Sequence, residues 1–223
     1  IAQLHLADSN RPGGIIAQII AQAEARGIPI RYHEKQALSR ISKNGRQDQG
    51  VALDINCPRF ASIDSLLSDN PSTPARLLAL DGITNPQNVG MIIRSAVAAG
   101  LDGLLYPRKG VAALGPLVIK ASAGTVFRAP LILCDTLAPA LEQLKTCGYK
   151  IATLEAAAPE SLFSYDAQER MVFVLGGETS GVSDAVSQLA SQRLAIPMSN
   201  EVESLNVAVT AALVAFHLAT NRH

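Results

Sequence analysis

Apolar and polar residues follow two different rhythms along the chain, and from residue 76 onward these rhythms alternate. Short apolar runs are typical of buried strands, and apolar residues that recur every three or four positions are typical of amphipathic helices. The predicted strands span 77–80, 103–106, 131–134, 150–154, 171–175 and 194–197. The predicted helices span 87–99, 115–122, 136–147, 183–191 and 204–220. This alternation predicts an α/β domain with a mainly parallel sheet that helices cover on both faces.

The beginning of the chain shows the same rhythms on a smaller scale. Strand patterns at 1–6, 28–32 and 50–55 flank helical patterns at 15–23 and 34–40. The stretch SDNPSTPA at 68–75 then places two prolines among small polar residues, which is typical of a linker and also compatible with a long loop inside one domain. We therefore predict a small α/β domain at 1–67, a linker at 68–75 and a larger domain at 76–223.

One strand–helix–strand unit, LLALDGITNPQNVGMIIRSAVAAGLDGLLYP at 77–107, carries unusual polar residues on its helix. Asn88 lies near the start of the helix, and Gly90 lies one turn before Arg94. A glycine beside an arginine predicts a notch where a ligand could approach the backbone. The alternative is an ordinary sheet-covering helix with a solvated arginine.

Two later stretches carry further candidate residues. MVFVLGGETSGVSD runs from an apolar strand into Gly176, Gly177 and Glu178, and the glycines would let a ligand meet backbone groups directly. LAIPMSNEVESLNVAVTAALVAF leads into the last helix, where Ser204 is predicted to be the N-cap and Asn206 to lie in the first turn. The alternatives are an ordinary loop carboxylate and a plain capped helix.

All three stretches lie at the carboxyl ends of predicted strands, the edge at which open parallel sheets bind ligands. We therefore expect them to form one site. The ligand is not predicted to be a nucleoside triphosphate, because Val182-Ser183 stands where a P-loop has its Lys-Ser/Thr pair. No G-x-G-x-x-G dinucleotide motif is present either.

Composition and charge narrow the possible partners. Apolar residues make up 48% of the chain and charged residues 17%, as in globular domains. The formal net charge is zero, so an RNA partner would need a local basic patch. Arg40, Lys43 and Arg46 belong to the most basic stretch and are candidate phosphate contacts, with a solvated charged face as the alternative.

Cysteine and histidine usage argues against metal chemistry. Three scattered cysteines and four scattered histidines form no metal-ligand pattern, so we expect no metal and a reducing, cytoplasmic compartment. No apolar run is long enough to span a membrane, and no membrane partner is expected.

The segments NPQNVGMIIRSAVAAG, VLGGETSGV and IPMSNEVESLNVAVTAA resemble, in order and spacing, the three motifs of SpoU/TrmH-type RNA methyltransferases of the SPOUT superfamily. The resemblance covers about 77–220. Residues 1–55 are similar to the small RNA-binding domain of that family, and we expect this domain to be truncated at its start. The resemblance implies a trefoil knot in the larger domain, bound S-adenosylmethionine and a homodimer with its site near the subunit interface.

The resemblance also implies an activity and its residues. It implies methyl transfer from S-adenosylmethionine to a ribose 2′-hydroxyl of RNA, with ribosomal RNA favoured over transfer RNA. The implied catalytic residues are Arg94, Asn88, Glu178, Ser204 and Asn206. The implied cofactor contacts are Gly176, Ile196 and Leu205, with Gly177, Met198 and Thr153 as neighbours. The alternatives are a base-modifying SPOUT methyltransferase, a cofactor-binding RNA chaperone without turnover and a plain nucleotide-binding module.

Overall fold

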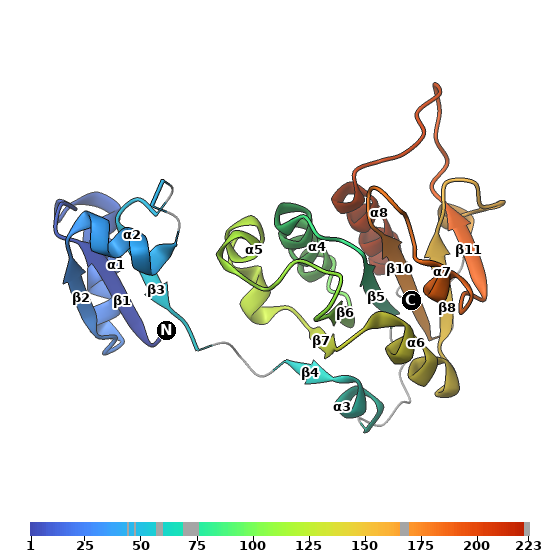
Figure 1. Cartoon of the computed structure of the whole chain (residues 1–223), viewed down its shortest axis with the longest axis horizontal. Coiled ribbons are helices and arrows are strands. Elements are labelled where there is room, and N and C mark those ends of the chain that lie inside the picture. Colours follow the sequence, from blue (N-terminus) through green and yellow to red (C-terminus); the bar gives the residue numbers. More distant parts are fainter. Residues whose placement is uncertain (44, 47, 57–59, 69–75, 166–169, 221–223) are drawn as a thin grey trace. The chain divides into compact units, whose positions relative to one another are not determined.

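The computed structural model describes residues 1–223 except 44, 47, 57–59, 69–75, 166–169 and 221–223. The chain forms two compact units, Ile1–Pro58 and Arg59–His223 (Figure 1). This division falls earlier than the predicted boundary at residue 67, because β4 (Ala61–Ser62) pairs with a strand of the larger unit and leads into α3 (Ile63–Ser68). The predicted linker, apart from Ser68, lies outside the described residues.

The smaller unit is a three-stranded mixed sheet with two helices. Its elements are β1 (Gln3–Ala7), α1 (Gly14–Ala25), β2 (Ile30–His33), α2 (Lys35–Ser42) and β3 (Val51–Asp54). β1 lies in the middle, parallel to β2 and antiparallel to β3. Leu4 and Leu6 on β1 pack with Ala23 of α1, so the intervening His5 points to the opposite face of the sheet.

The larger unit is built on an eight-stranded sheet in the order β4-β7-β6-β5-β10-β8-β11-β9, in which every described pairing is parallel. Its strands after β4 are β5 (Arg76–Asp81), β6 (Gly103–Pro107), β7 (Leu131–Cys134), β8 (Lys150–Leu154), β9 (Glu160–Ser161), β10 (Met171–Gly176) and β11 (Gln192–Ala195). Its helices after α3 are α4 (Pro86–Ala98), α5 (Pro116–Ala121), η1 (Thr125–Arg128), α6 (Leu137–Thr146), η2 (Leu162–Ser164), α7 (Asp184–Ser187) and α8 (Val207–Thr220).

Helices cover both faces of this sheet, as predicted. Alternate residues of β5 enter different cores: Leu78 and Leu80 pack with α4, α5 and α8, whereas Leu77 and Ala79 pack with α3, α6 and α7. The central strands are therefore apolar on both sides, which explains their continuous apolar runs. Each fully buried leucine contributes about 1.5–3 kcal/mol of transfer free energy. The predicted fold class is confirmed.

The strand order places a switch point in the middle of the sheet. From β5 the chain adds β6 and β7 on one side, then returns through α6 to β8, and β10 finally inserts between β5 and β8. Open α/β sheets bind ligands outside the carboxyl ends of their strands at such a point. The trefoil knot implied by the family resemblance stays a prediction.

Two helices differ from their predicted bounds by three or more residues at one end. The predicted helix at 183–191 is limited to Asp184–Ser187, and the last helix begins at Val207 instead of residue 204. Among the described residues, no helix is both long and apolar enough to cross a membrane.

Candidate functional site

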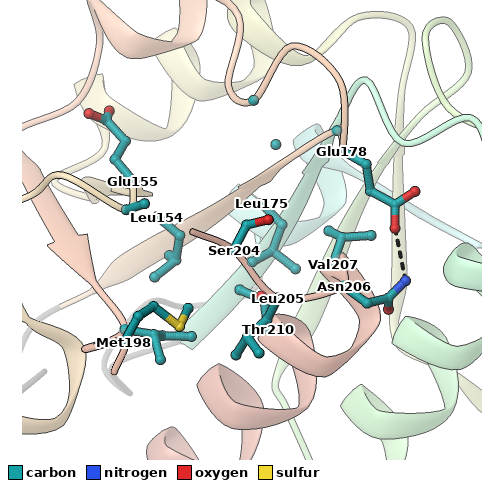
Figure 2. Close-up of a pocket in the computed structure, with 15 residues that line it drawn as sticks. Leu154, Glu155, Leu175, Glu178, Met198, Ser204, Leu205, Asn206, Val207 and Thr210 are labelled. Atoms are coloured by element: carbon teal, nitrogen blue, oxygen red, sulfur yellow. Dashed lines mark hydrogen bonds between the residues drawn. The ribbon is translucent and has the colours of Figure 1, made fainter. Parts of the chain in front are cut away.

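The segments that follow β8, β10 and β11 enclose a cavity of about 420 Å³ together with the start of α8 (Figure 2). Its apolar walls are Leu154, Leu175, Ile196, Met198, Leu205 and Val207. Polar groups enter from Glu155, Glu178, Ser204, Asn206 and Thr210, and backbone from Ala156, Gly176, Gly177 and Gly181 completes the lining. An apolar cavity with a few polar groups at its rim is typical of a small-molecule site.

One edge of the cavity is closed by a carboxylate that two amides hold in place. Oε1 of Glu178 accepts hydrogen bonds from Nδ2 of Asn206 at 2.8 Å and Nδ2 of Asn88 at 2.9 Å. Nδ2 of Asn206 also lies 3.2 Å from Oδ1 of Asn88. Three predicted catalytic residues from three distant stretches thus meet at one point.

The two hydrogen bonds orient the carboxylate of Glu178 and leave one of its oxygens available to a ligand. Asn88 is buried, with 6% of its surface exposed, whereas Glu178 and Asn206 face solvent. Both of these hydrogen bonds reach Oε1, and Oε2 has no hydrogen-bond partner among the described residues. A carboxylate oxygen held at the rim of a cavity can accept a hydrogen bond from a hydroxyl of a bound substrate.

The cap of α8 corrects one prediction. Oδ1 of Asn206 accepts the backbone N–H of Ala208 at 2.9 Å, so Asn206 is the N-cap and does not lie in the first turn. Ser204, the predicted cap, lies two residues before it on an exposed loop and lines the cavity. The cap uses the oxygen of the Asn206 amide and leaves its nitrogen for Glu178, so one side chain joins helix and site.

The glycines of the site are required by backbone contacts within the protein. A Cβ on Gly176 would lie 2.2 Å from the carbonyl carbon of Gly181, and one on Gly177 would lie 2.5 Å from the carbonyl oxygen of Gly82. Gly177 and Gly181 exchange backbone hydrogen bonds at 3.1 and 2.9 Å, which folds the loop tightly against the sheet end. These glycines shape the cavity wall. The close backbone neighbours leave no room for a Cβ, which accounts for glycine at both positions without a ligand.

The predicted ligand notch at Gly90 is wrong. A Cβ on Gly90 would lie 2.4 Å from the Cβ of Ala121 and 2.8 Å from the backbone nitrogen of Ser122. Gly90 is buried and allows α4 to pack closely against α5. The periodicity that placed Gly90 beside the apolar stripe does not distinguish helix packing from ligand access.

A second carboxylate at the cavity was missed in the sequence. Oε1 of Glu155 accepts a hydrogen bond from Oγ1 of Thr153 at 2.8 Å and lies 3.8 Å from Nε of Arg193. Thr153 itself is fully buried, and its neighbours Leu154–Ala156 line the cavity in its place. The sequence signal that could have identified Glu155 is its position, because an acid directly after a buried parallel strand lies at the ligand-binding edge of the sheet.

Arg94 lies outside the cavity of its own chain. It is exposed on α4, on the face that also exposes Gln87, Met91 and Ala98 at helical spacing. No residue of the cavity lining contacts it through a hydrogen bond or ion pair within the described part of the chain. The structure therefore unites Asn88, Glu178 and Asn206 but does not bring Arg94 to them within one chain.

The candidate RNA-binding residues of the smaller unit lie at the end of α2 and in the loop that follows. Arg40 is exposed in the last turn, Lys43 has a left-handed backbone with φ of 53°, and Arg46 is exposed on the loop. Asp48 anchors this loop: the backbone N–H of Gly50 and the hydroxyl of Ser42 donate to its carboxylate, which holds its pKa below the usual value. Arg40, Lys43 and Arg46 are thus exposed cations close in sequence to the anchored Asp48.

Asn206→Ala is expected to lower stability and activity together. Loss of the cap should cost about 0.5–2 kcal/mol, measured by denaturant unfolding. Asn85→Ala is the matched control, because Asn85 caps α4 through the N–H of Gln87 at 2.9 Å without touching Glu178. We expect similar losses of stability in both variants but a loss of activity only in Asn206→Ala. Equal activities in the two variants would show that the amide cluster does not take part in the reaction.

Comparison with known proteins agrees with this geometry. Residues 75–216 match the model of the SpoU rRNA Methylase family, and residues 2–61 match the model of the RNA 2′-O ribose methyltransferase substrate-binding domain. These two matches define the class of the protein: it is an RNA ribose 2′-O-methyltransferase. The chain belongs to the SpoU rRNA methylase family.

Relatives span both units of the chain. It is 32% identical to an uncharacterized tRNA/rRNA methyltransferase of Mycobacterium ulcerans (strain Agy99) over 93% of this chain and 67% of that protein. It is 33% identical to the 23S rRNA (guanosine-2′-O-)-methyltransferase RlmB of Xylella fastidiosa (strain 9a5c) over 97% of this chain and 88% of that protein. The chain thus spans about two thirds of the mycobacterial relative and most of the Xylella protein.

Solved structures share the fold. The SpoU methyltransferase AviRb from Streptomyces viridochromogenes, in complex with the cofactor AdoMet, matches with a TM-score of 0.76 and 19% identity, covering 100% of this chain and 83% of that one. An AdoMet-bound rRNA methyltransferase from Sinorhizobium meliloti matches with a TM-score of 0.76 and 21% identity, covering 100% and 81%.

Proposed function

We propose that the chain transfers the methyl group of S-adenosylmethionine to a ribose 2′-hydroxyl of ribosomal RNA. The observation that carries the proposal is the cavity at the strand ends, where Asn88 and Asn206 hold the carboxylate of Glu178. The cofactor contacts proposed for this cavity are Gly176, Gly177, Ile196, Met198 and Leu205, which all line it. Thr153 is buried next to the cavity lining and would contribute indirectly, because its hydroxyl donates a hydrogen bond that orients Glu155.

The charge of the cavity favours a cationic ligand. Glu155 and Glu178 lie at opposite ends of the apolar lining, as Figure 2 shows. S-adenosylmethionine carries a sulfonium and an ammonium group against one carboxylate, whereas ATP carries several negative charges. Arg193 partly balances Glu155 at 3.8 Å, and the remaining negative charge favours the first ligand over the second.

The proposed role of the protein in the reaction is positioning and charge stabilisation. The 2′-oxygen attacks the sulfonium methyl in line, and the C–S bond breaks as the C–O bond forms, leaving S-adenosylhomocysteine. Holding the two atoms in near-attack geometry supplies much of the acceleration. Asn88, Glu178, Ser204 and Asn206 would orient the ribose, with Oε2 of Glu178 free to accept a ribose hydroxyl.

Arg94 would complete the site from a second copy of the chain. Its guanidinium stays protonated, so it would stabilise the developing alkoxide or hold the adjacent phosphate while the hydroxyl proton leaves to water or phosphate. Met91 beside it on α4 is 46% exposed, and Val209 and Phe216 on the neighbouring α8 are 44% and 50% exposed. Apolar stripes on two helices that pack together favour a dimer in which each copy supplies Arg94 to the other.

Ribosomal RNA is the proposed substrate. The Xylella relative is named for 23S rRNA, and the smaller unit matches a substrate-binding model. The smaller unit also has seven Lys/Arg against five Asp/Glu up to residue 58, whereas the chain as a whole is balanced. A ribosomal substrate would place the enzyme in the cytoplasm.

Lys43→Gln with Arg46→Gln is expected to weaken RNA binding and reduce its salt dependence. If each side chain neutralises one phosphate, the slope of log K against log salt should become less steep by about 0.7–0.9 per residue removed. Fluorescence anisotropy with labelled ribosomal RNA at several salt concentrations measures this slope. Arg26→Gln, which removes a cation at the end of α1, is the matched control and should keep the full slope. An unchanged slope in the double variant would show that Lys43 and Arg46 are solvated surface residues that do not contact phosphates.

Two experiments test the proposed function. Calorimetry should show binding of S-adenosylmethionine and none of ATP. Methyl transfer from labelled S-adenosylmethionine should then be compared on ribosomal RNA and transfer RNA, with ribosomal RNA expected to accept the label. Binding of the cofactor without transfer to either RNA would instead favour a chaperone without turnover.

A further inference from the structure

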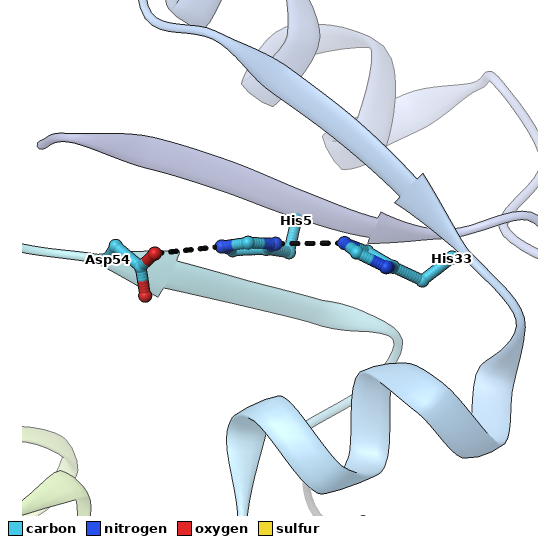
Figure 3. A network of polar contacts seen from close by, with 3 residues as sticks. All are labelled: His5, His33 and Asp54. Carbon is cyan, nitrogen blue, oxygen red and sulfur yellow. Dashed lines mark hydrogen bonds and ion pairs between the residues drawn. The ribbon is translucent and has the colours of Figure 1, made fainter.

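Three titratable side chains in the smaller unit form a chain of hydrogen bonds that the methyl-transfer site does not use (Figure 3). Nδ1 of His5 lies 2.9 Å from Nε2 of His33, and Nε2 of His5 lies 3.1 Å from Oδ2 of Asp54. The three residues come from β1, β2 and β3, so the chain crosses the whole sheet. His5 is 5% exposed, whereas Asp54 and His33 are accessible at the two ends.

Counting protons fixes the hydrogen-bond directions when both imidazoles are neutral. Two imidazole nitrogens at 2.9 Å share one proton, and a carboxylate requires a donor. His5 must therefore carry its proton on Nε2 to donate to Asp54, and its bare Nδ1 accepts from Nε2–H of His33. Nδ1 of His33 is then a bare acceptor, and it has no hydrogen-bond partner among the described residues.

Addition of one proton changes the outer end of the Asp54–His5–His33 network, which is Nδ1 of His33. Whether the positive charge rests on His33 or on His5, both internal hydrogen bonds can be kept only if Nδ1 of His33 carries a proton. The outer nitrogen thus changes from an acceptor to a donor. Asp54 balances the charge, much as a carboxylate orients and stabilises the imidazolium of a catalytic histidine.

Charged groups of both signs lie on the elements around the histidine pair. The charged groups on the adjoining elements are Arg31 on β2, Lys35 and Arg40 on α2, and the acids Asp8 and Glu34 at the ends of β1 and β2. Arg31 is in register with His5 and exposed, and α2 packs against β1 and β3. Alternation along β2 places Arg31 on the same face of the sheet as His33, so a permanent cation shares that face with the nitrogen that gains a proton.

We propose that His33 is a phosphate contact for RNA and that RNA binding is coupled to uptake of one proton by the Asp54–His5–His33 chain. A phosphate oxygen accepts a hydrogen bond from the protonated Nδ1 of His33, and it repels the bare nitrogen that is present when both imidazoles are neutral. The proposal rests on the proposed function in so far as the ligand is RNA. It adds a pH-dependent contact to the permanent charges of Lys43 and Arg46.

The test measures the RNA affinity of the complete protein, with both units, as a function of pH. Ribosomal RNA cut into short fluorescein-labelled fragments serves as the probe, at constant salt between pH 8 and pH 6. We expect binding to tighten about five- to tenfold as the pH falls, because linkage favours the proton-binding state. The salt slope should also steepen by about 0.7–0.9 at pH 6, as for one added phosphate contact.

Variants separate this contact from a structural role. His33→Gln keeps an amide group beside His5 but cannot present a protonated nitrogen to a phosphate, so most of the gain in affinity between pH 8 and pH 6 should be lost. Asp54→Asn should reduce the pH-dependent gain, because the balancing charge is lost. Lys35→Gln is the matched control: it removes a permanent cation of the same surface and should keep the full pH dependence.

Two outcomes would overturn the proposal: wild-type binding that does not change with pH, or His33→Gln with the full wild-type pH dependence. The wild-type measurement decides even if a variant fails to fold. Failure of the proposed function would look different. In that case methyl transfer would be absent, while the pH-dependent binding of RNA through His33 could still be observed.

Discussion

Arg94→Ala is expected to reduce methyl transfer by about 10²–10³-fold while S-adenosylmethionine binding stays near that of the wild type. The reason is geometric, because Arg94 is exposed on α4 and lies outside the cavity that would hold the cofactor. Single-turnover transfer from labelled cofactor measures the first quantity, and calorimetry measures the second. Arg94→Lys should recover only part of the activity, since an ammonium group cannot replace the planar fork of a guanidinium.

A mixed dimer tests the source of the arginine. One copy carries Arg94→Ala and the other carries Glu178→Gln, with different affinity tags so that only the mixed species is purified. If Arg94 acts across the interface, one of the two sites is intact and about half of the wild-type activity should return. If Arg94 acts within its own chain, both sites are damaged and activity should stay low. Loss of cofactor binding in Arg94→Ala would contradict the assigned position of Arg94.

Gly176→Ala is expected to abolish cofactor binding. Its Cβ would lie 2.2 Å from the carbonyl carbon of Gly181 and 2.3 Å from the backbone nitrogen of Val182, so the loop must move away from the strand end. Overpacking of this kind costs about 1–3 kcal/mol of stability. Displacement of a cavity wall by an ångström can also lower the rate by about 100-fold. Calorimetry measures the loss of cofactor binding, and denaturant unfolding measures the loss of stability.

Gly115→Ala is the matched control for this substitution. A Cβ there would meet its nearest neighbour, the carbonyl oxygen of Ala113, at 3.8 Å, and φ of Gly115 is −117°, which alanine adopts readily. We expect the control to bind S-adenosylmethionine as the wild type does. Normal cofactor binding by Gly176→Ala would show that the loop from 176 to 182 does not form the cofactor site.

Periodicity predicted the architecture because burial on two faces leaves a clear pattern. The central strands read as continuous apolar runs since Leu77 and Leu78 enter different cores, and the helices show one apolar stripe each. Position at strand ends also predicted that Asn88, Glu178 and Asn206 share one edge of the sheet. The direction of the chain and the order of its elements are enough for both predictions.

Local packing could not be predicted in the same way. Gly90 is required by the close approach of α5, and the spacing of residues in α4 alone does not show what packs against it. The cap of α8 lies at Asn206 because its amide bonds both Ala208 and Glu178, a contact between distant segments that the N-cap preference of serine does not include. The His5–His33 pair likewise depends on strand register, which the sequence leaves open.

Nucleoside analysis of RNA labelled by the purified protein tests the central claim most directly. The protein is incubated with labelled S-adenosylmethionine and ribosomal RNA, and the product is hydrolysed in alkali. A methyl group on the ribose oxygen blocks cleavage of the adjacent phosphodiester, so the label should appear in an alkali-stable dinucleotide. Label in a base-methylated mononucleotide, or no transfer of label, would contradict the account.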